Sequence, residues 1–345
     1  MKKVLTVSVM AVVLVFATAA WAVTIETVPV GDPNNAGEWS GESYGGYGPD
    51  RLCGAVPYEY RIGKYEVTAG QYCEFLNAVA DADPYGLYNT YMDSDSWGCQ
   101  ITRNGSSPNY TYDFSGRPSG AESDWVNRPV NYVSWGDAAR FATWLHNGHP
   151  TGAQGLSTTE DGSYYLNGAI TDAALLAVVR ESDWEWAITS EDEWYKAAYY
   201  TGSGSTYYDY PSGTNAVPSN DLLSPDGGNN ANFYQDGGYT IGSPYYRTPV
   251  GEFELSESPY GTFDQGGNVW EWNEAILYVT CRGLRGGPFD FGDDYLLASS
   301  RNGDGPSFEF SLIGFRVSEV PEPTCLTILA LGGLALLLRR RTVRG

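Results

Sequence analysis

The sequence predicts a mixed α+β fold with little regular secondary structure, because of its composition, three helix starts and several short strand patterns. The 345 residues include 42 glycines, 27 tyrosines and 11 tryptophans, whereas only 18% are charged. Glycine-rich backbone follows irregular paths, and large rings supply buried area where helices and strands are short. We therefore expect loops packed by aromatic side chains around a few regular elements.

Three helices are predicted by a shared start pattern. A Ser or Thr is followed three residues later by Gln, Asp or Glu, and apolar residues then recur at helical spacing. The hydroxyl can cap free amide groups, and the acidic first turns of the last two segments suit the helix dipole. The starts lie at residues 68–71, 134–137 and 190–193.

Short strands and long loops are predicted between these helices. Strand-like segments rich in apolar and glycine residues lie at residues 58–67, 241–253 and 283–316. Polar segments rich in Gly, Ser, Asn and Asp predict surface loops at residues 81–127, 147–183 and 201–230. Ligand specificity is expected in these loops, since loops carry most binding residues.

The charge of the chain excludes some classes of partner. The formal net charge is −22, and Lys/Arg runs occur only at the two ends. Binding to nucleic acid needs a basic surface, so no nucleic-acid partner is expected. An anionic membrane surface is excluded for the same reason. Divalent cations and neutral polar ligands suit this charge.

Residues 1–22 predict a secretory signal peptide. Lys2 and Lys3 precede an apolar run, and Ala20-Trp21-Ala22 offers small residues around a cleavage site. Residues 23–50 then form an N-terminal segment ahead of the main domain. We expect an exported protein, with signal peptidase as a partner.

Residues 320–345 predict a second targeting signal. Val320-Pro321-Glu322-Pro323 is followed by an apolar stretch at 324–338 and by arginines at 339–341. The stretch is short for a membrane span, and the arginines favour a cytoplasmic C-terminus. One interpretation is a weak membrane anchor with a short transmembrane helix. The order of features also resembles the PEP-CTERM sorting signal, which implies an exosortase partner in a Gram-negative, exopolysaccharide-producing bacterium and removal of the tail.

Four cysteines remain outside the tail: Cys53, Cys73, Cys99 and Cys281. In an exported protein they could form two disulfides in any of three pairings. Cys53 with Cys99 is one such pairing, whereas Cys73 lies in a predicted helix and could be a buried thiol.

Two other groups of residues are weak evidence for a binding site. His146 and His149 are the two histidines, and their spacing does not suit a zinc pair on a helix, so solvated loop histidines are favoured. The acidic segment 181–194 holds three tryptophans that could stack on a sugar ring, although core packing and helix capping explain it as well.

Seven words in order resemble the formylglycine-generating (sulfatase-modifying factor) family. The resemblance covers Arg51 to Ser318 and implies one compact α+β domain with little regular structure, related to C-type-lectin-like folds. The words lie at residues 62–79, 128–145, 189–198, 231–235, 261–272, 285–287 and 314–317. The last three contain GNVWEW (267–272), RGG (285–287) and GFRV (314–317).

The family's copper enzymes carry two cysteines between the RGG and GFR words. By this resemblance the two positions fall on Phe291 and Leu296, and no cysteine lies between Cys281 and Cys325. A cuprous ion needs thiolate ligands, so copper is not expected and Cys281, upstream of RGG, is no substitute.

The same resemblance implies calcium. Hard oxygen donors would come from the side chains of Asp264 and Glu271 and from the carbonyls of Gly267 and Val269. The alternative is that Trp270 and Trp272 are core residues and the carboxylates are merely solvated. A second set would begin at Asn232 and Phe233, with its remaining ligands near residues 242–245.

The sequence therefore predicts a non-catalytic, calcium-stabilised binding or matrix protein. It would be anchored transiently in the inner membrane and then sorted to the outer cell surface or extracellular matrix, with an exopolysaccharide or another envelope component as a partner. The alternative is an oxidoreductase of the formylglycine-generating type, acting in sulfatase maturation, or another enzyme on the same fold.

Overall fold

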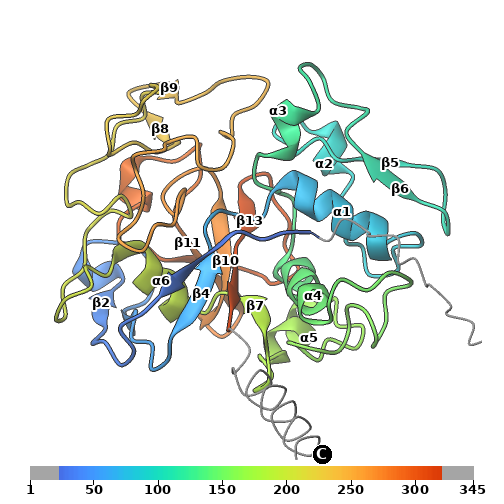
Figure 1. Cartoon of the computed structure of the whole chain (residues 1–345), viewed down its shortest axis with the longest axis horizontal. Coiled ribbons are helices and arrows are strands. Elements are labelled where there is room, and N and C mark those ends of the chain that lie inside the picture. Colours follow the sequence, from blue (N-terminus) through green and yellow to red (C-terminus); the bar gives the residue numbers. More distant parts are fainter. Residues whose placement is uncertain (1–22, 321–345) are drawn as a thin grey trace, which may run out of the picture.

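Two four-stranded sheets organise residues 23–320, the part of the chain that the computed structural model describes (Figure 1). The first sheet has the order β1-β4-β14-β7, with strands at Thr27–Val30, Tyr60–Gly63, Val317–Glu319 and Trp186–Ile188. The second has the order β12-β11-β10-β13, with strands at Asn302–Asp304, Cys281–Arg285, Trp270–Leu277 and Ile313–Phe315. Both sheets are antiparallel except where β13 runs parallel to β10.

The three predicted helices are present and capped as expected. They are α1 (Ala69–Val79), α4 (Trp135–His146) and α6 (Glu191–Tyr199). In each, the hydroxyl of the N-cap residue accepts from the third amide of the helix, and the side chain three residues on accepts from the N-cap amide. Reciprocal bonds of this kind satisfy two otherwise free amides, which explains why these segments are helical.

The connecting segments contain only short elements. The helical ones are α2 (Tyr91–Ser94), α3 (Ser123–Val126), α5 (Asp172–Ala177), η1 (Glu42–Tyr44) and η2 (Asp293–Tyr295). Three hairpins are formed by β2 (Glu38–Ser40) with β3 (Arg51–Cys53), β5 (Thr102–Asn104) with β6 (Thr111–Asp113), and β8 (Tyr234–Gln235) with β9 (Gly238–Tyr239). The prediction of α+β structure with little regular content is confirmed.

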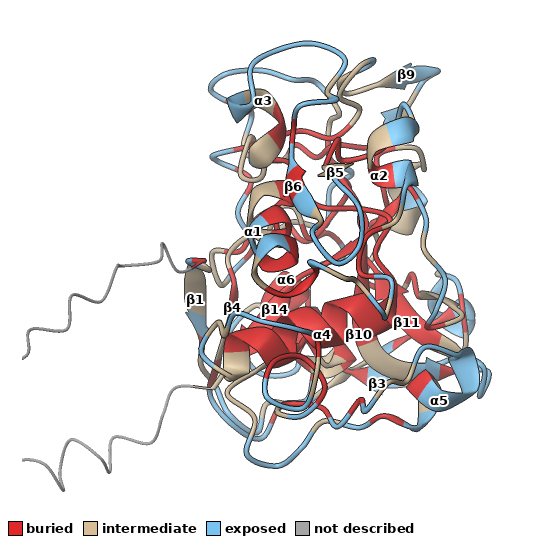
Figure 2. Ribbon diagram, turned by 90° about the vertical axis from the view of Figure 1, so that its right-hand side faces the viewer, coloured by how far each residue is buried: buried red, intermediate tan, exposed pale blue. Residues whose placement is uncertain are grey.

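The core is built around α4. Every residue of this helix except His146 is buried, and Figure 2 shows it as an inner element of the molecule. The helix is buried on all sides, as is usual for the centre of a larger domain. Its polar Arg140 is compensated by Glu160, whose carboxylate lies 2.6 Å from Nε in a pair that is almost fully shielded from water.

Parallel pairing of β10 and β13 brings two distant sequence words together. Trp270 and Glu271 lie opposite Ile313 and Gly314. The contact needs a glycine at 314, because an added Cβ would meet the Val130 carbonyl oxygen at 2.5 Å. The GNVWEW and GFRV words are therefore neighbours in one sheet.

Some expectations differ from the structure. Residues 241–253 form no strand, because proline and turn residues interrupt the pattern, and only residues 60–63 of segment 58–67 pair. The four cysteines outside the tail are free thiols, so the pairing of Cys53 with Cys99 is wrong. Burial places these two side chains in separate apolar clusters.

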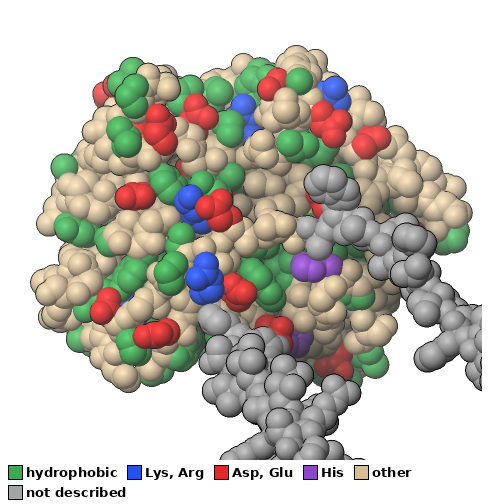
Figure 3. Space-filling model, viewed as in Figure 1, with side chains coloured by type: hydrophobic (Ala, Val, Ile, Leu, Met, Phe, Trp, Pro, Cys, Tyr) green, Lys and Arg blue, Asp and Glu red, His purple; other side chains and the backbone are tan. Residues whose placement is uncertain are grey.

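The predicted signal peptide and almost all of the predicted sorting tail lie outside the described residues. Within residues 23–320, no helix has the length and apolar character needed to cross a membrane. On the face shown in Figure 3, carboxylates are scattered among mostly uncharged atoms and Lys or Arg side chains are sparse.

Candidate functional site

The two positions that correspond to copper ligands are occupied by apolar packing. Leu296 is fully buried against Tyr210, Ala231 and Phe233. The Phe291 ring packs edge-on against Tyr295, with ring centroids 4.8 Å apart. Neither side chain has an atom that can bind a metal.

Of the free thiols, Cys53 lies beside the arginine of the RGG word. Its sulfur is 3.3 Å from Nη2 of Arg285, and the side chain is fully buried. Burial raises the pKa of Cys53 to about 11, and the carboxylate of Glu191 adds to the shift. The thiol therefore keeps its proton at neutral pH and is a poor nucleophile and a poor metal ligand.

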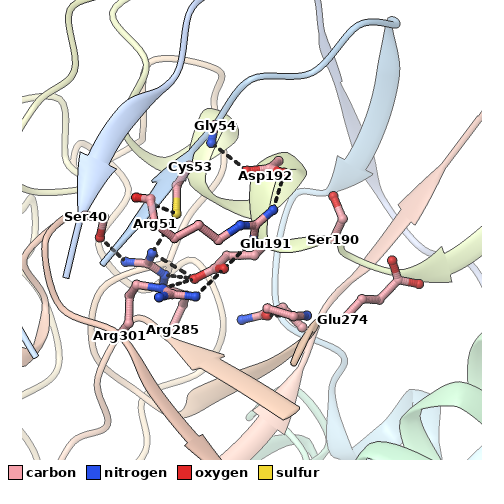
Figure 4. A network of polar contacts seen from close by, with 12 residues as sticks. Ser40, Arg51, Cys53, Gly54, Ser190, Glu191, Asp192, Glu274, Arg285 and Arg301 are labelled. Carbon is pink, nitrogen blue, oxygen red and sulfur yellow. Dashed lines mark hydrogen bonds and ion pairs between the residues drawn. The ribbon is translucent and has the colours of Figure 1, made fainter. Parts of the chain in front are cut away.

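Arg285 belongs to a buried ion-pair network centred on Glu191, at the start of α6 (Figure 4). Nε of Arg301 lies 2.6 Å from the Glu191 carboxylate and Nη2 of Arg285 lies 2.8 Å from it. Arg51 bridges Glu191 and Asp192. Burial alone would raise the pKa of Glu191, but the three arginines hold it well below its ordinary value. The RGG arginine thus has a structural role in this chain.

The loop before β10 is shaped by left-handed backbone. Asp264, Gly267 and Asn268 all have positive φ. A Cβ at Gly267 would lie 2.3 Å from the carbonyl oxygen of Asn232, and the Asn268 amide donates to that same oxygen over 2.8 Å. The loop therefore joins the two predicted calcium segments, one starting at Asp264 and the other at Asn232.

Glu271 and Arg316 form a fully buried ion pair at the end of this loop. Nε and Nη2 of Arg316 lie 2.6 and 2.7 Å from the two carboxylate oxygens, and the indole N–H of Trp194 donates to the same carboxylate. Arg316 also donates to the carbonyls of Gly63 and Phe263. The guanidinium of the GFRV word therefore neutralises Glu271 directly.

Two further carboxylates lie close to this pair. Asp264 accepts from the Gly251 amide over 2.6 Å, and burial raises the pKa of Asp264 to about 6. Glu66 accepts from the side-chain amide of Asn268 and from the backbone amide of Val269, and burial raises its pKa well above the ordinary value. The charges of Asp264 and Glu271 raise it further.

Sequence reasoning missed Glu66. An available signal was its position, because it is in phase with the buried Tyr60 and Ile62 of the preceding strand. A carboxylate in phase with core residues is unusual and calls for a partner. Glu66, Asp264 and Glu271 lie within electrostatic reach of one another, with Arg316 paired to Glu271 and the buried Arg247 acting on Glu66.

The first predicted calcium set fits a divalent cation in donor type. Carboxylate and carbonyl oxygens are the ligands that calcium prefers. A cavity of about 20 Å³ beside Asp264 has room for a single ion or water, but Gly267, Val269 and Glu271 do not line it. Glu271 faces Arg316, so Asp264 is the carboxylate best placed to bind directly.

The second predicted set fits less well. The side-chain oxygen of Asn232 is buried and has no hydrogen-bond partner among residues 23–320. The Phe233 carbonyl, however, already accepts from Asn220 and Thr240, each over 3.2 Å. Across the described part of the chain, no three His, Cys, Asp or Glu side chains group as a metal site would require.

The structure does not form a site from the two histidines or from the tryptophan-rich segment 181–194. His146 ends α4 and accepts from the Glu185 amide, whereas His149 packs edge-on against Trp144. Both histidines are partly buried, and burial lowers both pKa values; His149 lies in a loop as predicted, whereas His146 ends a helix. In segment 181–194, Trp194 is fully buried in the core.

The fold and the buried loop together define a loop-rich α+β domain whose characteristic arginines are structural. The family described as "Sulfatase-modifying factor enzyme 1-like domain" matches residues 54–320. The chain therefore belongs to the sulfatase-modifying factor family, and the resemblance seen in its sequence words is confirmed.

Known proteins similar to this chain include one enzyme of the family. The "Formylglycine-generating enzyme" of Thermomonospora curvata is 24% identical over 253 residues, which cover 66% of this chain and 62% of that enzyme. The chain thus spans less than two thirds of that relative's length.

Three solved structures are also similar. CarF has 18% identity and a TM-score of 0.47, covering 87% of this chain and 99% of that one. PvdO from Pseudomonas aeruginosa has 17% identity and a TM-score of 0.49, covering 85% and 93%. Treponema denticola variable protein 1 has 17% identity and a TM-score of 0.47, covering 86% and 95%.

Proposed function

We propose that the protein is a non-catalytic, calcium-stabilised binding or matrix protein that is exported and sorted to the cell envelope. The observation that carries the non-catalytic part is the apolar packing of Phe291 and Leu296 where copper thiolates would be needed. Cys53 is the described thiol beside the RGG arginine, and its buried, protonated state does not replace them. The sequence of the tail supports sorting by an exosortase.

A second candidate is supported by the name of the curated relative, a formylglycine-generating enzyme. One assay separates the two. A thiol peptide bearing the sulfatase motif is incubated with the protein, copper and oxygen, and aldehyde is measured. We expect no aldehyde above that formed by copper and oxygen alone. Aldehyde that increases with protein concentration would overturn the non-catalytic proposal.

Calcium is proposed at the Asp264 loop. Asp264 and the carbonyls of Gly267 and Val269 would hold the ion, while Glu271 and Glu66 would contribute negative charge nearby. A bound ion would neutralise Asp264 and fix the loop. The proposed role is structural.

Thermal unfolding tests the calcium proposal. A chelator should lower the melting temperature of the native protein, because an ion that binds only the folded state stabilises it. Asp264→Asn should remove the difference between calcium and chelator. Asp293→Asn, on the partly exposed η2, should keep it. Identical melting curves with calcium and chelator for the native protein would refute the site.

Export and sorting are tested in a producing cell. The chain should be recovered in the outer envelope or medium, and a variant ending at residue 320 should be exported but lost from the cell surface. Cytoplasmic recovery of the intact chain would contradict the proposal.

A further inference from the structure

A groove follows one face of α1 on the surface of the domain. Its volume is about 730 Å³, within the range of small-molecule sites. The helix contributes residues from Gly70 to Asn77, which at 1.5 Å per residue corresponds to about 10 Å of its length. The other walls come from β6, both ends of α3, residues 24–26 and 65–68, and Val250. We call this feature the α1 groove.

Aromatic and aliphatic side chains form much of the groove wall. Ile25, Tyr65, Val67, Phe114 and Val126 all line it. These residues come from different segments, so the hollow is a feature of the tertiary fold. It is separate from the positions of Phe291 and Leu296, which do not line it.

The charged residues of the α1 groove are all acidic. Five carboxylates line it and no Lys, Arg or His does so, among the residues that the structure describes. The carboxylates are Glu26, Glu66, Glu74, Asp113 and Glu122. They come from separate segments of the chain. Lys64 neutralises Glu26, and burial raises the pKa of Glu66 well above its ordinary value, so the charge of the groove comes from Glu74, Asp113 and Glu122.

Contacts within the protein account for three of these carboxylates. Glu26 pairs with Lys64, Glu66 accepts from Asn268, and Asp113 accepts from the Ser115 amide. The exposed side chains of Glu74 and Glu122 form no hydrogen bond or ion pair within residues 23–320. They are therefore free to bind a ligand.

Cys73 lies on α1 one residue before Glu74 and also lines the groove. Burial raises the pKa of Cys73 to about 12. After burial, Cys99 contributes most to this shift, and the charges of Asp113, Glu122 and Glu74 add to it.

We propose that the α1 groove binds a ligand that carries primary ammonium groups, paired with Glu74 and Glu122. Ammonium groups match the charge, and the apolar wall can cover the carbon skeleton between them. Two sources share this chemistry: a free polyamine and an oligomer of a de-N-acetylated amino sugar. The inference depends on Glu74 and Glu122 and is independent of the proposed non-catalytic role. The groove and the calcium loop share one buried residue, Glu66.

Isothermal titration calorimetry of the full-length protein tests this binding. The probes are spermidine, a glucosamine oligomer and the matching N-acetylglucosamine oligomer, which has the same sugar skeleton without the charge. We expect one binding site for spermidine, for the glucosamine oligomer or for both, and no binding of the acetylated oligomer. The probe that binds more tightly identifies the source. If neither cationic probe binds at millimolar concentration, or if the acetylated oligomer binds equally well, the proposal is wrong.

A matched pair of double variants locates the site. Glu74→Gln with Glu122→Gln removes the two free carboxylates, and the loss of two partly solvated ion pairs should weaken binding about tenfold. Glu254→Gln with Glu257→Gln removes the same charge from exposed residues outside the groove. This control should change affinity by less than about twofold.

All four positions are exposed, so both double variants should fold and melt like the native protein. Equal weakening by the two double variants would show diffuse attraction to an acidic protein and would refute the site. Undiminished binding in the groove variant would refute it too.

Discussion

Replacing Glu191 with Gln should destabilise the protein strongly. Glu191 accepts from Arg285 and Arg301 in a region where both arginine side chains are almost fully buried. Gln has the same shape but no charge, so the substitution would leave these buried guanidinium groups without their main counter-charge. Removing one partner of a buried pair costs about 3–5 kcal/mol. We expect a loss of about 4 kcal/mol, or roughly 10 °C in melting temperature.

Urea denaturation at neutral pH measures this loss. The appropriate control is Glu319→Gln, because Glu319 pairs with Arg61 over 3.4 Å at a site that is about one third exposed. Exposed pairs contribute less than about 1 kcal/mol, so the control should unfold close to the native midpoint. A Glu191→Gln midpoint within the range of the control, with an unchanged slope, would refute the view that the network is maintained by charge pairing.

The network also has a pH dependence with a definite sign. Because the arginines hold the pKa of folded Glu191 below its ordinary value of 4.5, its contribution is fully present above that pH. The contribution should be lost as pH falls below about 4.5 and the carboxylate takes up a proton. In Glu191→Gln this part of the acid unfolding profile should be shallower than in the native protein.

Two further predictions concern packing and pH. Gly314→Ala should lower the free energy of unfolding by about 2 kcal/mol, because the new Cβ would meet the Val130 carbonyl at 2.5 Å. The control Gly31→Ala should be nearly neutral, because nothing lies within 4 Å of its Cβ. Equal urea midpoints for the two variants would contradict this prediction. Burial and the charge of Asp137 raise the pKa of Glu309 to about 8, so stability should fall as pH rises from about 4.5 towards 8. Glu309→Gln should reduce that slope in urea melts between pH 5 and 8, and an unchanged slope would count against the shift.

Local signals made the main helices predictable. The capping residues at 68–71, 134–137 and 190–193 act within four residues, so the sequence alone contains the whole interaction. Segment 241–253 could not be predicted in this way, because its strand-like residues have no partner strand. Strand formation depends on a neighbour elsewhere in the chain, and the pattern of one segment cannot show that neighbour.

The candidate site was predictable only in part. Asp264 and Glu271 could be proposed as a pair because they lie seven residues apart in one word. Arg316 and Glu66 could not, since their contacts with this loop span 45 and more than 200 residues of sequence. The arginine changes the interpretation of Glu271 from a free metal ligand to one member of a buried ion pair.

The position of β14 constrains how the domain can fold. This strand, at Val317–Glu319, lies inside the first sheet, between β4 and β7, and is made last of the four. Until β14 is synthesised, β4 and β7 lack the strand that pairs with both of them, and the sheet cannot form completely. Contacts across so much sequence form slowly and late. The N-terminal half is therefore unable to complete its fold during synthesis, so chains that stop before residue 317 should be substrates for proteases.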